Sequence, residues 1–244
     1  MPKADALPNP IDFLTGRWPG WDGAQVPDGV RPPWPKFAPD GRVLPFPGTT
    51  IVCHVPPDSD THRSLVAMQA DLKAAPFAEH FTYLPPASLH MTLFDLSNEL
   101  RRGTSAWPEG IGDGASWPEV SDALAARLEG LNLPRFAPKA TTLFSGFSLI
   151  LEGATTAQEH SLRSARDTLR DKTQIFRDDH ESYVFHVTLA YPLRFMPQDS
   201  AEAVTAFCHS LFETYASALS TITLGPAEMC DFNDMYAFAP RLTF

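Results

Sequence analysis

Apolar residues along the chain change their spacing in a way that predicts a strand, a helix and a second strand. The segment TTIVCHVP at residues 49–56 is rich in β-branched residues, which favour a strand. Leu65, Met68 and Leu72 then follow at the three- and four-residue spacing of one helix face. The segment SLHMTLF at residues 88–94 again has the composition of a strand. These segments together form one predicted strand-helix-strand unit.

The same unit is repeated further along the chain. The segments GFSLILEG and VFHVTLA predict its two strands, and an apolar stripe over residues 162–169 predicts the helix between them. The separation of Val52 from His90 in the first copy matches that of Leu149 from His186 in the second to within one residue. Because the spacing agrees so closely, the sequence indicates an internal duplication.

Each copy is followed by a further amphipathic helix. Residues 117–128 and residues 199–219 both place apolar residues at helical spacing. A Gly-rich polar loop is expected over residues 96–116, between the first unit and its helix. The predicted fold class is therefore α+β, with one lobe at about residues 49–140 and a second at about 141–244. Strands can be exchanged between the two lobes.

The segment 1–48 has a different character from the rest of the chain. It is rich in proline and contains Trp18, Trp21 and Trp34, which are three of the five tryptophans of the chain. Proline disfavours regular helices and sheets, and a disordered tail would seldom keep so many large aromatic residues. We therefore expect this segment to form an irregular arm that packs on the body through its tryptophans.

Composition narrows the class of protein. A chain of 244 residues with 43 % hydrophobic residues can bury a substantial core, and its net charge of −10 disfavours long nucleic acids as partners. Cys53, Cys208 and Cys230 show no paired spacing, which suggests reduced thiols. With neither a signal-like start nor a long apolar run in the sequence, we expect a cytoplasmic protein without a membrane partner. The oligomeric state is left open.

A histidine and a threonine occur two residues apart in the second strand of each unit. Because alternate residues of a strand share a face, His90, Thr92 and Phe94 are expected to point to one side. His186 and Thr188 share a face in the same way. If the two units are related by a pseudo-two-fold axis, both histidines and both threonines can line one groove.

This set of side chains suits the chemistry of phosphate esters. A neutral histidine can accept a proton from the attacking oxygen, and a protonated histidine can donate one to the leaving oxygen. Two threonine hydroxyls can hold the non-bridging phosphate oxygens as negative charge develops. The reaction requires no metal and no cofactor, and the remaining histidines show no metal-ligand spacing.

The paired motifs resemble those of the two-histidine (2H) phosphoesterase superfamily. HMTL at residues 90–93 and HVTL at residues 186–189 both fit its His-x-[Ser/Thr]-x pattern, and the resemblance covers roughly residues 49–240. It implies a bilobal fold in which two antiparallel sheets face a central groove with helices outside. It also implies hydrolysis of small cyclic phosphodiesters such as 2′,3′-cyclic nucleotides, with His90 and His186 as acid and base.

Five further residues are candidates for substrate binding. Phe94 could stack on a base, although an aromatic residue in a strand is commonly part of the core. Tyr183 precedes the second motif and falls on its back face if the strand is regular there. Arg42, Arg101 and Arg102 could contact a phosphate, although arginines of this kind are commonly solvated surface residues.

Two other functions remain open from the sequence. An enzyme that processes RNA ends, or one similar to 2′-5′ RNA ligases, should carry a continuous basic track beside the groove. A sensor that binds a nucleotide without turning it over would keep the same motifs. The leading prediction is a metal-independent hydrolase of a small cyclic phosphodiester.

Overall fold

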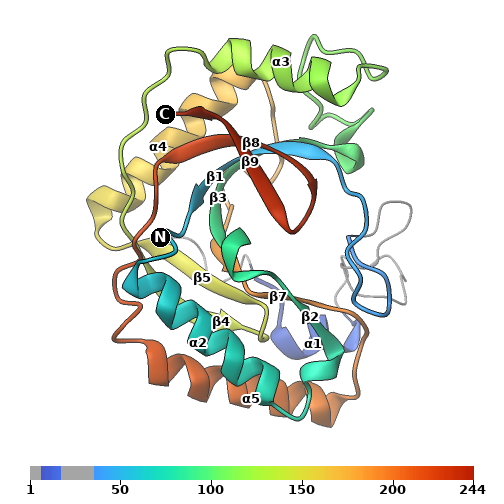
Figure 1. The fold of residues 1–244 in the computed structure, drawn as a ribbon, viewed down its shortest axis with the longest axis vertical. Coiled ribbons are helices and arrows are strands. Elements are labelled where there is room, and N and C mark those ends of the chain that lie inside the picture. The colour runs from blue at the N-terminus through green and yellow to red at the C-terminus, as the bar shows by residue number, and fades with distance from the viewer. Residues whose placement is uncertain (1–6, 18–35) are drawn as a thin grey trace.

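The computed structural model describes residues 7–17 and 36–244 (Figure 1). Its main feature is a seven-stranded sheet in which all neighbouring strands are antiparallel. The strand order is β4-β5-β6-β3-β1-β8-β9. The strands are β1 (Gly48–His54), β3 (His90–Asn98), β4 (Pro138–Phe144), β5 (Ser148–Gly153), β6 (Phe185–Thr188), β8 (Ala227–Asp234) and β9 (Ala237–Thr243).

The duplicated units predicted from the sequence are present. The first is β1, α2 (Asp60–Ala74) and β3, and the second is β5, α4 (Thr156–Thr173) and β6. Both helices begin at a hydroxyl cap, because Ser59 and Thr155 each accept a hydrogen bond from a backbone N–H of the first turn. The predicted helices that follow the two units are also found, as α3 (Trp117–Leu128) and α5 (Gln198–Tyr215). The α+β class is thus confirmed.

The two predicted sheets prove to be the halves of one continuous sheet. They join where β3 pairs with β6, through the single residue pair Met91 and Val187. The C-terminal strands β8 and β9 extend the first half, because β8 pairs with β1. A small second sheet, β2 (Phe81–Tyr83) with β7 (Ala190–Pro192), lies outside the main one and was not predicted. Its strands are too short for an alternating pattern to be detected.

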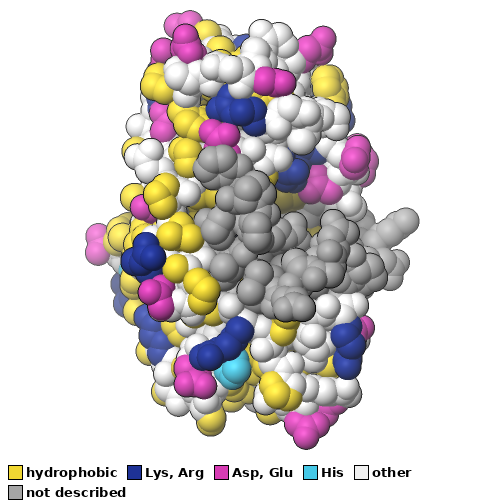
Figure 2. All heavy atoms as spheres, turned by 90° about the vertical axis from the view of Figure 1, so that its right-hand side faces the viewer, with side chains coloured by type: hydrophobic (Ala, Val, Ile, Leu, Met, Phe, Trp, Pro, Cys, Tyr) yellow, Lys and Arg dark blue, Asp and Glu magenta, His cyan; other side chains and the backbone are white. Residues whose placement is uncertain are grey.

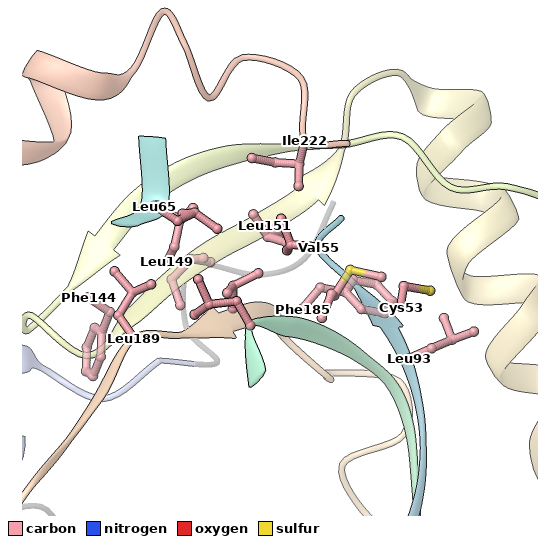
Figure 3. Close-up of a cluster of buried hydrophobic side chains, with 14 of the residues drawn as sticks. Cys53, Val55, Leu65, Leu93, Phe144, Leu149, Leu151, Phe185, Leu189 and Ile222 are labelled. Atoms are coloured by element: carbon pink, nitrogen blue, oxygen red, sulfur yellow. The ribbon is translucent and has the colours of Figure 1, made fainter. Parts of the chain in front are cut away.

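One hydrophobic core is shared by both units. Helix α4 contacts β5 and β3, and α5 contacts β4. Figure 3 shows Cys53 and Leu93 from the first unit in the same cluster as Leu149 and Phe185 from the second. Because side chains of both units are fully buried against one another, the two halves of the sheet are fixed relative to each other.

The N-terminal segment contains a helix where an irregular chain was expected. Helix α1 (Pro10–Thr15) is capped by Asn9, whose side chain accepts hydrogen bonds from two backbone N–H groups. Pro10 stands at the first helical position, where its missing N–H costs nothing. Phe13 and Leu14 are buried against the body. The predicted anchors Trp18, Trp21 and Trp34 lie outside the described residues.

Within the described residues, no helix is both long and apolar enough to cross a membrane. The three cysteines are buried and unpaired, as the sequence suggested.

Candidate active site

The two His-x-Thr motifs lie on adjacent strands at the centre of the sheet. Met91 of β3 and Val187 of β6 are directly opposite each other and fully buried. Residues on either side of these two therefore point to the other face of the sheet. Because the strands run antiparallel, His90 and Thr188 lie on the same side of the Met91–Val187 pair. Thr92 and His186 lie together on its other side. A local two-fold relation through the central pair thus exchanges the motifs.

The four motif side chains line one cavity of about 180 Å³. His90 and His186 are half-buried in its wall, with Thr92 and Thr188 beside them. The remaining lining includes polar side chains that were not predicted, among them Lys36, Thr50, Asp95, Asn98, Arg177 and Tyr191. The cavity is small for a ligand site, since such sites commonly measure about 300–1,000 Å³.

The same hydrogen bond orients both imidazoles. Nδ1 of His90 lies 2.7 Å from the carbonyl oxygen of Ser88, and Nδ1 of His186 lies 2.9 Å from that of Val184. In each case the acceptor is two residues upstream. Because a carbonyl oxygen only accepts, Nδ1 carries the proton and Nε2 keeps a lone pair for proton transfer.

The environment favours the neutral form of both histidines. Burial lowers the pKa of His90 to about 4, against the opposing effect of the Ser88 carbonyl, and the charges of His54, His186 and Lys36 lower it further. Burial also lowers the pKa of His186, and Lys36 acts in the same direction. An anionic phosphate between the rings would reverse this preference, because it stabilises the protonated form.

Two cations found in the cavity wall were not predicted. Nζ of Lys36 lies 3.5 Å from the hydroxyl of Tyr191 and 5.1 Å from its ring centre. Arg177 forms two hydrogen bonds of 2.9 Å with Asp179 and one of 2.7 Å with Asp95. Burial would lower the pKa of Arg177, but these carboxylates outweigh it and raise the pKa. Their positions come from the fold, since neither residue belongs to a motif of the sequence.

Phe94 lies in the core, so its expected place in the groove is wrong. Thr92 pairs with Val52 and Phe94 pairs with Ile51, which leaves the residue between them as an extra one on β3. A bulge of this kind shifts the alternation by one residue. Asp95 thereby reaches the cavity, and Phe94 turns away with no exposed surface.

Tyr183 lines the cavity, although a regular strand would have placed it on the back face. Strand β6 begins only at Phe185, so strand alternation does not apply to Tyr183. Its hydroxyl lies 3.4 Å from the carbonyl oxygen of Thr92, across the junction of the two half-sheets. The guanidinium of the buried Arg166 lies 3.8 Å from its ring centre and donates to the carbonyl oxygen of Leu93 at 2.7 Å.

The three arginines predicted as phosphate contacts lie outside the cavity lining. Arg42 is exposed. Nη2 of Arg101 lies 3.8 Å from a carboxylate oxygen of Asp95. Arg102 bonds Glu99 and the carbonyl oxygens of Asp113 and Ala115, and its guanidinium packs on two tryptophan rings. Arg102 therefore holds together the loop between β3 and α3, which is a structural role; the predicted loop 96–116 begins later than expected, because β3 extends to Asn98.

A cluster of metal-ligating residue types lies elsewhere in the described residues. Asp167, His180 and Glu181 bring one ligand atom each within 4.8 Å of one another. Nη1 of Arg170 lies 3.3 Å from Asp167 and 3.9 Å from Glu181, so both carboxylates already have a cationic neighbour. None of the three ligands lines the cavity of the His-x-Thr motifs.

Comparison with known proteins confirms the resemblance drawn from the motifs. The family model 2H-phosphodiest, described as a domain of unknown function (DUF1868), matches residues 36–142. This span contains the first His-x-Thr motif and supports a phosphoesterase role. A crystal structure of a conserved protein of unknown function from Agrobacterium tumefaciens matches with a TM-score of 0.88 and 27 % identity. The match covers 97 % of this chain and 99 % of that one. No curated protein matches the sequence.

Proposed function

We propose that this chain, with its two-histidine phosphoesterase motifs and family match, hydrolyses a small cyclic phosphodiester of the 2′,3′-cyclic nucleotide type. The observation that carries the proposal is the two-fold relation of the motifs around one cavity. Each half contributes a hydroxyl and an imidazole whose Nε2 has no hydrogen-bond partner among the described residues. A phosphate between them would have one histidine on the side of the attacking water and one on the side of the leaving oxygen.

The proposed reaction assigns one role to each histidine. Nε2 of neutral His90 takes a proton from water while the water oxygen forms a bond to phosphorus. The bond from phosphorus to one ribose oxygen breaks, and that oxygen takes a proton from Nε2 of His186. Of the two, His90 takes the base role because its pKa is lowered strongly, to about 4. The product is a phosphate monoester, and a proton returns from His90 to His186 through solvent to complete the cycle.

Hydroxyls and a cation would stabilise the developing charge. Thr92 and Thr188 can donate to the two non-bridging oxygens, which gain negative charge in the transition state. Lys36 adds positive potential in the same cavity, whereas the charge of Arg177 is balanced by Asp95 and Asp179. No divalent ion has a part in this scheme, so the proposed enzyme is metal-independent.

The surface charge favours a small substrate. On the face of the molecule drawn in Figure 2, the Lys and Arg side chains of the described residues are scattered and interspersed with acidic ones. An RNA-binding track would instead join basic side chains into a stripe. Together with the net charge of −10, this favours a mononucleotide-sized ester over RNA-end processing or 2′-5′ ligation.

A substrate screen tests the proposal. The purified protein is incubated with 2′,3′-cyclic mononucleotides, 2′-5′ dinucleotides and short RNAs that end in a cyclic phosphate. Conversion of the mononucleotides to a single monoester, lost in His186→Ala, is the expected result. Tight binding without product would show a sensor, and turnover confined to the RNAs would show an end-processing enzyme.

A further inference from the structure

A second cavity opens directly beside the histidine cavity. It measures about 320 Å³ and shares Tyr183 and His186 with the first. Most of its remaining lining is apolar and includes Phe13, Phe144 and Phe147. A molecule that contacts His186 with its phosphate can therefore reach into this second cavity.

The sheet explains why the two cavities adjoin. Ile150 of β5 is directly opposite His186, and Ser148 is directly opposite Thr188. Opposite residues of an antiparallel pair lie on the same face, so both β5 residues continue the surface that carries the second motif. Both also line the second cavity. The lining of this face thus changes from the polar residues of the second motif on β6 to a mainly apolar surface at the neighbouring strand β5.

Aromatic rings form the far wall. The rings of Phe13 and Phe147 are stacked, with centres 5.2 Å apart and planes inclined by 18°. Phe144 meets both edge-on, at 5.6 Å from Phe13 and 5.4 Å from Phe147. Leu7 and Pro8 add to the lining, so the N-terminal segment contributes to this site. The matched family span begins only at residue 36 and does not include that segment.

The lining of the second cavity also includes polar groups. Ser148 and Ser182 offer hydroxyls, and Asp179 offers a carboxylate that also bonds Arg177 of the first cavity. Aromatic walls combined with hydrogen-bonding groups suit a planar heteroaromatic ring, whose faces are apolar and whose edge is polar. The histidine cavity alone is too small for a nucleotide, but the two cavities together fall within the usual range for small ligands.

We infer that the second cavity binds the base of the substrate while its cyclic phosphate lies between His90 and His186. The inference rests on the proposed function and adds the place where the base of the substrate binds, beside the second motif. The N-terminal segment then contributes directly to substrate recognition through Leu7 and Phe13.

The test compares two esters in matched variants. Adenosine 2′,3′-cyclic phosphate carries a base, and glycerol 1,2-cyclic phosphate does not. Phe147 is half-buried at the cavity wall, and Phe207→Ala removes a similarly half-buried ring on α5 as the control. For each protein, kcat/KM and the calorimetric Kd are measured with both esters.

Phe147→Ala should weaken binding of the nucleotide and lower its kcat/KM by about five- to a hundredfold, the range for loss of a stacked base. The same variant should change both values for the glycerol ester by no more than about twofold. Leu7→Ala should show the same selectivity with a smaller effect, and Phe207→Ala should affect neither ester.

The outcomes separate the two proposals. If wild type hydrolyses both esters and Phe147→Ala changes them equally, the base site is wrong and the function stands. If the cyclic phosphodiester of a long-chain alkane-1,2-diol, measured as a third ester, loses as much affinity in Phe147→Ala as the nucleotide does, the cavity accepts any apolar group and the aromatic assignment is wrong. If neither ester is hydrolysed but nucleotide binding still depends on Phe147, the enzymatic proposal fails and the base site stands.

Discussion

Replacement of His90 by asparagine should make the protein more resistant to acid relative to wild type. The pKa of His90 is lowered from 6.5 to about 4, chiefly by burial. Below pH 6.5, the imidazole of His90 is therefore protonated more readily in the unfolded chain than in the folded one. The stability that depends on a neutral His90 is complete above pH 6.5 and is lost as the pH falls towards 4.

The size of the effect follows from that difference in pKa. One pKa unit corresponds to about 1.4 kcal/mol, so a shift of this size gives at most about 3 kcal/mol. Since the imidazole is only half-buried, solvent screens part of this energy, and we expect about 2 kcal/mol at pH 4.5. Asparagine has no titrating group, and its amide N–H can still donate to the carbonyl oxygen of Ser88.

Urea unfolding at pH 8 and at pH 4.5 measures this directly. From pH 8 to pH 4.5, the free energy of unfolding of wild type should fall by about 2 kcal/mol more than that of His90→Asn. The exposed His209 on α5 provides the control variant His209→Asn, for which no such shift is expected. A difference between wild type and His90→Asn that is the same at both pH values would refute the reasoning about burial.

Three further outcomes are expected. His90→Ala and His186→Ala should each lower turnover of the screened ester by about a hundredfold or more. Thr92→Val or Thr188→Val should lower turnover by a smaller factor. Full activity of a histidine variant would remove that residue from the mechanism. The acid limb of kcat/KM reports the base His90 and should lie below pH 6.5, because burial lowers the pKa of His90 in the free protein, and chelators should leave the rate unchanged. A rate abolished by chelator and restored by a divalent ion would instead indicate a metal-activated water. Arg166→Ala should lower the free energy of unfolding by about 3 kcal/mol, from the lost bond to the Leu93 carbonyl and the lost ring contact with Tyr183, and an unchanged urea midpoint would contradict this.

The buried position of Arg166 is a feature that only the fold explains. Nε and Nη2 have no hydrogen-bond partner among the described residues, and burial lowers the pKa to about 10. The guanidinium lies where β3 and β6 diverge after their single residue pair. It bonds the Leu93 carbonyl at the β3 bulge, and Tyr183 approaches the neighbouring carbonyl of Thr92. These two side chains take the place of strand pairing at the junction.

The sequence by itself determined the repeat and the motifs. Strand and helix periodicity are local properties, and both copies showed them over enough residues to give α2, α4 and the strands that flank them. The identity of His90, Thr92, His186 and Thr188 as a set followed from the same local pattern. That they line one cavity was a hypothesis from symmetry, and the antiparallel pairing of β3 with β6 is what brings them together.

The tertiary structure decided what the alternation rule could not. A single extra residue in β3 turned Phe94 into the core and brought Asp95 to the cavity, and no local pattern of the sequence marks that bulge. Lys36 reaches the cavity from a segment far from both motifs, and Arg177 reaches it from the loop between α4 and β6, because long-range pairing and packing place their backbones there. Local spacing fixes which face of a strand a side chain occupies, whereas the partners of that face depend on contacts between distant segments, which only the folded chain defines.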